Sequence, residues 1–236
     1  MYHIRVFRAI DDLEACEKFA YGHAKVLTDY GVTKVTSART DWFDNPGVFV
    51  VLVQNEETKE VVGGERIHLV QPGYPLPIES AISVVEEGIY ALVARYAKGA
   101  ITGEICGLWN AKSIAGKGVS VLLTKIGVAI ARKLGMDSLF VLCAPYTVKM
   151  CQDAGFEIET SIGNKGQFIY PKLDLIATSL IVRDLDHLAY ADKDFRSEIF
   201  GYFENPVGEC VEHGQKGETQ ISYDISIPNI RNEYGL

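Results

Sequence analysis

The spacing of apolar and polar residues along the chain first predicts a strand and a hairpin. Residues 4–9, IRVFRA, alternate as in a half-buried strand. The runs VFVVLVQ (48–54) and EVVGGERIHLV (60–70) are rich in β-branched residues and flank the turn-like NEETK, so we expect them to pair as a hairpin. The adjacent glycines Gly63 and Gly64 indicate a bulge or a close backbone approach in the second strand.

A second group of elements follows a mostly helical insert at about residues 72–100. Residues 101–111 and 138–144 are apolar enough to form strands, and the second of these is expected at the centre of the sheet. The most regular helical pattern lies between them, from Val119 to Leu134, with one apolar stripe formed by Leu122, Ile126, Ile130 and Leu134. A short helix, YTVKMCQDAG, and further strand candidates such as FEIETSI and LIATSLIV come next.

This order of elements, β–α–ββ–insert–β–α–β–α–ββ, predicts an α/β chain with a mixed sheet in one domain, residues 1–185. Beyond that point the pattern weakens. DKDFRSEIFGYF reads as a helix and ECVEHGQKGETQISYDISI as a hairpin turning over HGQKG. We therefore expect a C-terminal extension, residues 186–236, that packs on the same domain and either covers a substrate site or forms a homodimer contact.

The composition argues against several classes of protein. The chain has 236 residues, 47% of them hydrophobic, which is enough for a sizeable core. Its net charge of −8 argues against a nucleic-acid partner. No apolar run approaches the roughly 18 residues of a membrane span, and the start lacks the apolar core of a signal peptide. Five scattered cysteines without a CxxC motif predict reduced thiols in the cytoplasm and neither a disulfide framework nor a metal site.

The loop before the long helix is the best candidate for binding chemistry. Gly116 and Gly118 flank Lys117 directly ahead of the helix. A nucleotide P-loop would need glycine at Ala111, and a dinucleotide fingerprint would need glycine at Val121, so neither motif fits. Exposed backbone amides at a helix start nevertheless favour an anion such as a phosphate.

The stretch from Glu104 to Glu157 resembles the GNAT superfamily of acyl-coenzyme A N-acyltransferases: strand, glycine loop, long helix, apolar strand, and a short helix ending in Gly155-Phe156. The resemblance extends over about residues 2–183. It implies a mixed, mostly antiparallel sheet with a central splayed strand pair and helices on both faces. It also implies acetyl-CoA or a longer acyl-CoA as co-substrate. The family's [Q/R]xxGx[G/A] hexad, which binds the pyrophosphate, falls on Ala115, Gly116, Lys117, Gly118, Val119 and Ser120.

The same resemblance implies roles for residues on either side of the loop. Leu108, Trp109 and Asn110 would hold the pantetheine arm with their backbone groups. Glu104 matches a position where some members carry the general base, and a carboxylate on an apolar strand has a raised pKa suited to that role. Period two places Glu104, Cys106, Leu108 and Asn110 on one face.

Three further positions complete the expected site. Cys151 stands where many relatives have the tyrosine that reprotonates the leaving thiolate. A thiol could donate that proton, or Cys151 could be a small buried hydrophobe. Tyr146, five residues earlier on a helix, would point about 140° away from it. On the hairpin strand, Glu65, Arg66 and His68 are alternatives to Glu104 as the base. Arg66 and His68 share one face and are candidates for substrate binding, while Glu65 points the other way.

Upstream residues resemble acyl-homoserine-lactone synthases and long-chain N-acyl amino acid synthases, branches of the same fold. The matching positions are Asp41, Asp44, Asn45, Gly63, Arg66, Leu76, Pro77 and Glu79, whereas Gly107 replaces the arginine of their E-x-x-R motif. We expect an N-acyltransferase for a small amine or amino acid. The alternatives are a long-chain synthase supplied by acyl carrier protein, with the insert lining an acyl channel, and a GNAT fold that binds thioesters without turnover.

Overall fold

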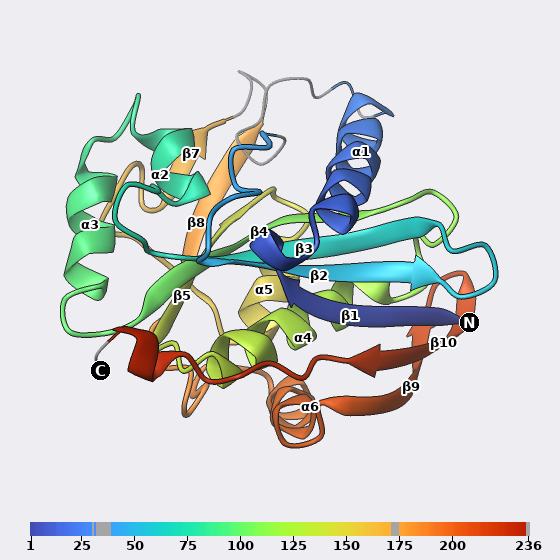
Figure 1. Cartoon of the computed structure of the whole chain (residues 1–236). Helices are drawn as coiled ribbons and strands as arrows, with labels where there is room; N and C mark the ends of the chain where they lie inside the picture. The colour runs from blue at the N-terminus through green and yellow to red at the C-terminus, as the bar shows by residue number, and fades with distance from the viewer. Residues whose placement is uncertain (30, 32–38, 171–174, 235–236) are drawn as a thin grey trace.

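The computed structural model describes residues 1–29, 31, 39–170 and 175–234. Within these ranges, ten strands form one sheet in the order β6-β8-β5-β4-β3-β2-β1-β10-β9, with β7 beside β8. The β1/β10 and β4/β5 pairs are parallel and the others antiparallel. The expected mixed, mostly antiparallel sheet is therefore confirmed (Figure 1).

The strands occupy the ranges expected from the pattern, with small differences at their ends: β1 (Tyr2–Arg8), β2 (Val48–Asn55), β3 (Val61–Leu69), β4 (Thr102–Asn110), β5 (Ser138–Cys143), β6 (Glu157–Ile158), β7 (Gln167–Ile169), β8 (Ile176–Val182), β9 (Val207–Gly214) and β10 (Gly217–Asp224). The FEIETSI run forms a strand over only two residues. It is limited to the outer edge of the sheet, where it pairs with β8 alone.

Helices cover both faces of the sheet, as predicted. One face carries the 3-10 helix η1 (Ala9–Asp11), α1 (Leu13–Asp29), α2 (Pro77–Ile82) and α3 (Gly88–Tyr96). The other carries α4 (Val119–Lys133) and α5 (Val148–Asp153), with α6 (Lys193–Glu204) beyond them (Figure 1). All four residues of the predicted stripe of α4 are fully buried against the sheet, which accounts for the strength of that pattern.

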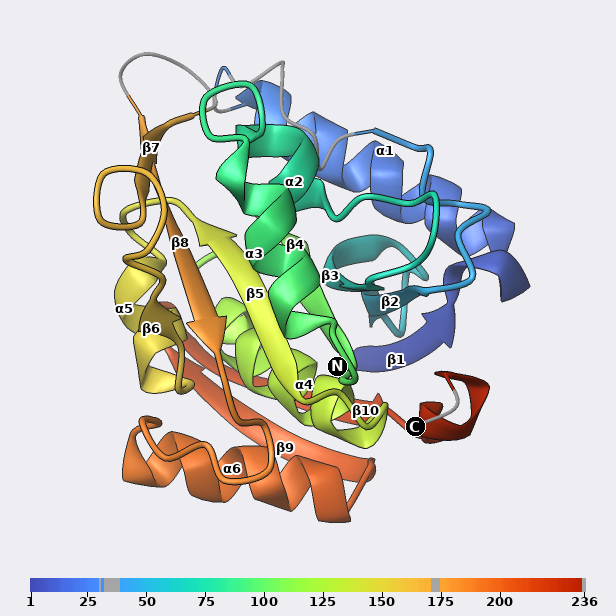
Figure 2. The same ribbon diagram turned by 90° about the vertical axis from the view of Figure 1, so that its left-hand side faces the viewer.

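The C-terminal elements extend the sheet. β10 pairs with β1, the β9–β10 hairpin turns at Gln215 and Lys216, and α6 packs on α4 (Figure 2). Lys125 of α4 is buried and forms ion pairs with Glu198 of α6 and Glu212 of β9, which joins these elements. The predicted helix and hairpin after residue 185 are both confirmed. The chain ends in a 3-10 helix, η3 (Arg231–Tyr234).

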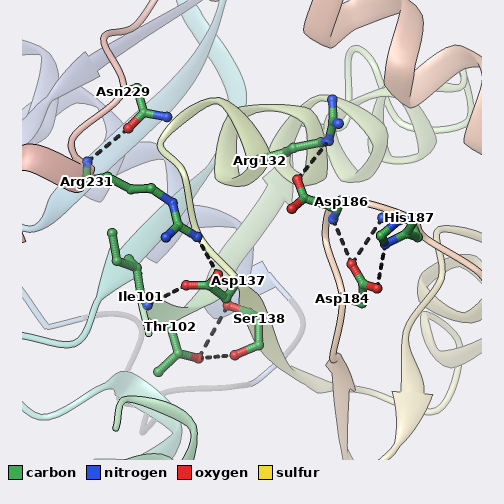
Figure 3. Close-up of polar contacts among 10 residues, drawn as sticks. All are labelled: Ile101, Thr102, Arg132, Asp137, Ser138, Asp184, Asp186, His187, Asn229 and Arg231. Carbon is green, nitrogen blue, oxygen red and sulfur yellow. Dashed lines mark hydrogen bonds and ion pairs between the residues drawn. The ribbon is translucent and has the colours of Figure 1, made fainter. Parts of the chain in front are cut away.

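Polar contacts join β4 and β5 where the two strands begin (Figure 3). The Ile101 N–H donates to Asp137 at 2.7 Å, and the hydroxyls of Thr102 and Ser138 are hydrogen-bonded at the same distance. Arg231 from the chain's last helical turn forms an ion pair with Asp137. These contacts hold one end of the strand pair together, so any separation of β4 from β5 has to occur at the other end.

No helix in the described residues combines the length and the apolar character that crossing a membrane requires.

Candidate functional site

The parallel pairing of β4 with β5 stops half-way along β4. Its register ends at Ile105, opposite Val141, although β4 continues to Asn110 and β5 to Cys143. The edge of β4 that faces β5 beyond Ile105 therefore presents backbone N–H and C=O groups outside the ladder, as strand edges do. The splayed strand pair predicted from the sequence is confirmed, and it opens at the end away from the polar contacts of Figure 3.

A cavity of about 260 Å³ lies at this opening. Glu104 and Cys106 line it from the α2 face of the sheet, and Glu65 lines it from the α4 face. Because side chains of both faces reach the same cavity, it passes through the gap in the sheet. Its remaining walls come from α1, α2, α4, α5, β5 and the segment after β7. They include His23, Leu27, Pro77, Ala81, Thr124, Leu142, Met150, Cys151 and Tyr170.

Glu104 is 2% exposed, and its Oε2 accepts a hydrogen bond from the Ile78 N–H at 2.6 Å. Burial raises the pKa of the Glu104 carboxyl to about 8. The Ile78 bond and the nearby Arg66 guanidinium favour the charged form without cancelling this effect. A carboxylate with a pKa near 8 can take a proton from an ammonium or an attacking amine close to neutral pH. The structure thus gives the predicted base a suitable environment.

Arg66 and His68 lie on β3 directly beside Glu104. His68 is opposite Glu104 and Arg66 is opposite Cys106 in the antiparallel register, so all four side chains share the α2 face. Arg66 is 1% exposed and packs over the Trp42 ring, with its guanidinium carbon 4.4 Å from the ring centroid. Burial and the Arg66 charge hold the pKa of His68 well below its usual range, so the imidazole stays neutral.

A second cavity of about 320 Å³ adjoins Arg66 and His68. It shares Pro77 with the first cavity, and its other walls are Arg39, Asp41, Trp42, Asn45, Gly73, Tyr74, Pro75 and Ser80. Asp41, Trp42 and Asn45 therefore meet Arg66 and His68 of the hairpin strand at this cavity. A polar cavity with a buried guanidinium suits a small ligand that carries a carboxylate.

Glu65 points away from these residues, toward α4. Its side chain is buried, and neither carboxyl oxygen has a hydrogen-bond partner among the described residues. Burial raises the pKa of Glu65 well above its usual range, because desolvation favours the protonated carboxyl over the carboxylate. Gly127 of α4 makes room for it, because a Cβ atom there would lie 2.4 Å from Glu65 Oε1.

Cys151 lies in the same part of the cavity and is 4% exposed. Its sulfur is 3.3 Å from that of Cys143, close enough for a thiol–thiol hydrogen bond. That bond and burial raise the pKa of Cys151 well above its usual range, which makes it a poor proton donor to another thiolate. Tyr146 precedes the first residue of α5, so the expected helical angle does not apply. It is exposed and lines the cavity mouth.

The predicted phosphate loop retains free donors. Gly118 adopts φ +83° at the N-cap of α4, and the backbone N–H groups of Gly116, Gly118 and Val119 have no partner within the described part of the chain. The β9–β10 turn covers the other side of the loop, where the Lys216 N–H donates to the Gly116 carbonyl at 3.0 Å. Ala115 and Ser120 border these donors, and the Lys117 ammonium lies over the Tyr2 ring.

The expectation that Glu104, Cys106, Leu108 and Asn110 share a face is wrong. Two residues of β4, Gly107 and Leu108, oppose the single Glu65 of β3, which makes a bulge with Gly107 at φ +62°. Beyond it the alternation reverses. The Trp109 side chain, not that of Leu108, joins the α1 face and packs edge-on against Phe19, 5.9 Å between ring centroids. Leu108 faces the α4 core, and the Asn110 amide is hydrogen-bonded to Ser120 Oγ at 2.6 Å.

Solved structures share this architecture. The N-acyl amino acid synthase FeeM from uncultured soil microbes is 14% identical, with a TM-score of 0.59 over 81% of this chain and 96% of FeeM. The CoA-dependent acyl-homoserine lactone synthase BjaI is 11% identical, with a TM-score of 0.57 over 100% and 99%. An acyl-CoA N-acyltransferase from Pseudomonas aeruginosa is 11% identical, with a TM-score of 0.50 over 77% of this chain and 99% of that protein.

The chain has the GNAT fold. Because the match to BjaI covers the whole chain, the C-terminal extension has a structural counterpart that the sequence resemblance, limited to about residues 2–183, did not reach. No protein-family model matches the sequence, and none of the curated proteins does either. These identities are low, so the comparisons establish the fold and leave donor and acceptor to the chemistry of the site.

Some cavity residues carried little signal in the sequence. His23 and Leu27 of α1 and Thr124 of α4 line the cavity because α1 and α4 converge on the split between β4 and β5. No local motif marks that convergence. Glu65 did have a signal, since it is a charged residue within the apolar run VVGGERIHL, directly after two glycines. Among the described residues, no group of three or more His, Cys, Asp or Glu side chains is placed to hold a metal ion.

Proposed function

We propose that this protein is an N-acyltransferase that moves an acyl group from an acyl-CoA thioester to the amine of a small molecule or amino acid by direct attack. The observation that carries the proposal is the cavity through the split between β4 and β5, with the raised-pKa carboxyl of Glu104 on one side. The donor and the amine reach this cavity from opposite faces of the sheet, so both can be bound at once.

Two features of the chain place the donor. The unpartnered N–H groups of Gly116, Gly118 and Val119 bind the pyrophosphate at the start of α4. The β5-facing backbone of Leu108, Trp109 and Asn110 pairs with the pantetheine arm and polarises the thioester carbonyl. One such donor to a developing oxyanion is worth about 3 kcal/mol of transition-state stabilisation.

The acceptor binds in the second cavity. Arg66 holds its carboxylate, neutral His68 lies beside it, and Glu104 takes the proton of the attacking amine. Glu104 is directly opposite His68 on the adjacent strand, and Arg66 precedes His68 by two residues on the same face, so the three side chains are neighbours on the β3–β4 ladder. An amino acid or a related amino carboxylate is therefore the acceptor class that fits.

The donor cavity also favours acyl groups longer than acetyl. Its walls at Pro77, Ala81, Leu142, Leu175 and Ala177 are apolar, and the first two belong to the helical insert. This observation supports a long-chain N-acyl amino acid synthase as the second candidate. A lactone synthase fits less well, because Gly107 replaces the expected arginine and the guanidinium of Arg66 lies 3.2 Å from where its Cβ would be.

Thiol release tests the proposal. The purified protein is mixed with acetyl-, octanoyl- or palmitoyl-CoA and pooled amino acids, free thiol is measured over time, and the acylated product is identified by mass spectrometry. We expect acceptor-dependent release that falls at least a hundredfold in Glu104→Gln, within the range typical for loss of a general base. Tight binding of all three donors without release would instead indicate a thioester-binding module.

The donor carrier and the acceptor need separate comparisons. The same octanoyl group is offered on CoA and on acyl carrier protein, and a lower KM for the CoA thioester supports the assigned phosphate loop. Arg66→Met tests the acceptor pocket, because it removes the charge and keeps an apolar side chain of comparable length. We expect it to raise the KM for amino acids far more than the KM for the matching decarboxylated amines.

A further inference from the structure

Resting on the proposed function, we propose that Glu65 is the general acid that protonates the leaving thiolate of the acyl donor. Transfer to an amine needs a proton acceptor on the amine side and a proton donor on the sulfur side. Glu104 supplies the first. In the family a tyrosine is the proton donor; Cys151 occupies that position here, and Glu65 lines the same cavity.

The two glutamates are on opposite faces of the sheet. Glu104 shares its face with Arg66, His68 and the acceptor cavity, whereas Glu65 faces α4. The phosphate loop leads into α4, so the donor enters along the α4 face and its sulfur lies on that side of the split. The carbonyl carbon then sits between base and acid, as direct displacement requires.

The buried carboxyl of Glu65 needs a polar partner inside the cavity. Both its carboxyl oxygens are buried and unpartnered among the described residues, and such groups are rare in folded proteins unless a ligand or water satisfies them. Its neighbours include the apolar side chain of Ile105 and Gly127. The β4 bulge leaves Glu65 opposite two residues, one of them a glycine, which keeps its side of the split open.

The reaction balances with these two groups. The amine nitrogen attacks the thioester carbonyl, the C–N bond forms, and the amine proton passes to Glu104. The C–S bond then breaks, and the sulfur takes the bonding electron pair and the proton of the Glu65 carboxyl. Glu104 returns its proton to water and Glu65 takes one from water, so the products are an amide and free CoA thiol.

A one-atom change in the donor separates this role from a structural one. Octanoyl-CoA and its selenoester analogue bind through the same groups, but the selenol is much the stronger acid and leaves without protonation. We expect Glu65→Gln to lower kcat for the thioester about a hundredfold, the lower end of the usual range for general acid catalysis, and to leave kcat for the selenoester nearly unchanged. Glu65→Asp, which keeps an acid, should recover part of the thioester rate.

Other results would overturn the assignment. An equal fall with both donors means that Glu65 supports the fold or binds the arm, and an unchanged thioester rate means that it has no part in the reaction. A thioester-selective loss in Cys151→Ala or Tyr146→Phe, and not in Glu65→Gln, assigns the proton to that residue instead. If the wild-type protein turns over neither donor with any amine, the proposed function itself fails, and the acid role falls with it.

Discussion

Replacing Glu104 by glutamine should change how stability depends on pH. The wild-type carboxyl has a pKa of about 8 in the folded protein and about 4.5 in the unfolded chain, so the folded state binds the extra proton between these values. The contribution of Glu104 to stability is greatest at low pH and falls as pH rises through this window. One pKa unit corresponds to about 1.4 kcal/mol, so the wild-type protein should lose about 2.5 kcal/mol between pH 5.5 and 7.5 through Glu104 alone.

Glutamine cannot ionise, and its carbonyl oxygen can still accept the Ile78 N–H bond, so the variant should lack that loss. Urea unfolding at pH 5.5, 6.5 and 7.5 gives the free energy of unfolding for both proteins. Glu65 and His68 titrate in both and cancel in the difference. Glu57→Gln, at an exposed turn, is the matched control and should follow the wild type. Parallel pH dependences for the wild type and Glu104→Gln would refute the raised pKa and, with it, the argument for the base.

Three other predictions concern the reaction and two glycines. With an acceptor that stays uncharged, kcat/KM should rise about tenfold per pH unit below pH 8 and level off above it, because Glu104 has to lose its proton; a flat profile from pH 6 to 8 would exclude it as the base. Gly118→Ala should cost about 1–2 kcal/mol in backbone strain at φ +83° and raise the KM for acyl-CoA; unchanged CoA binding in calorimetry would argue against the phosphate loop. Gly22→Ala would place Cβ 2.1 Å from the Trp109 ring and should lower the free energy of unfolding by about 1–3 kcal/mol. Gly201→Ala, with open space around it, should not lower it, and equal urea midpoints for the two variants would contradict the packing of Trp109.

The sequence determined the elements and their order because each depends on local patterning. α4 buries its apolar stripe, and β2 and β3 bury one face or both. This burial requires apolar residues at a regular spacing, which can be read directly from the sequence. Gly118 before α4 marked the helix start, since left-handed backbone there favours glycine. The motif order around these residues was enough to predict the GNAT fold and the position of the split.

Only the tertiary structure decided which side chains meet at the split. The bulge at Gly107 reverses the alternation of β4, and a strict period of two cannot reveal an extra residue whose presence depends on the partner strand. The burial of Glu65 and the meeting of His23, Thr124 and Met150 at one cavity arise from contacts between elements distant in the sequence. The chain alone fixes local patterning and motif order, whereas desolvation and long-range packing set which carboxyls have a raised pKa and on which face of the sheet each lies.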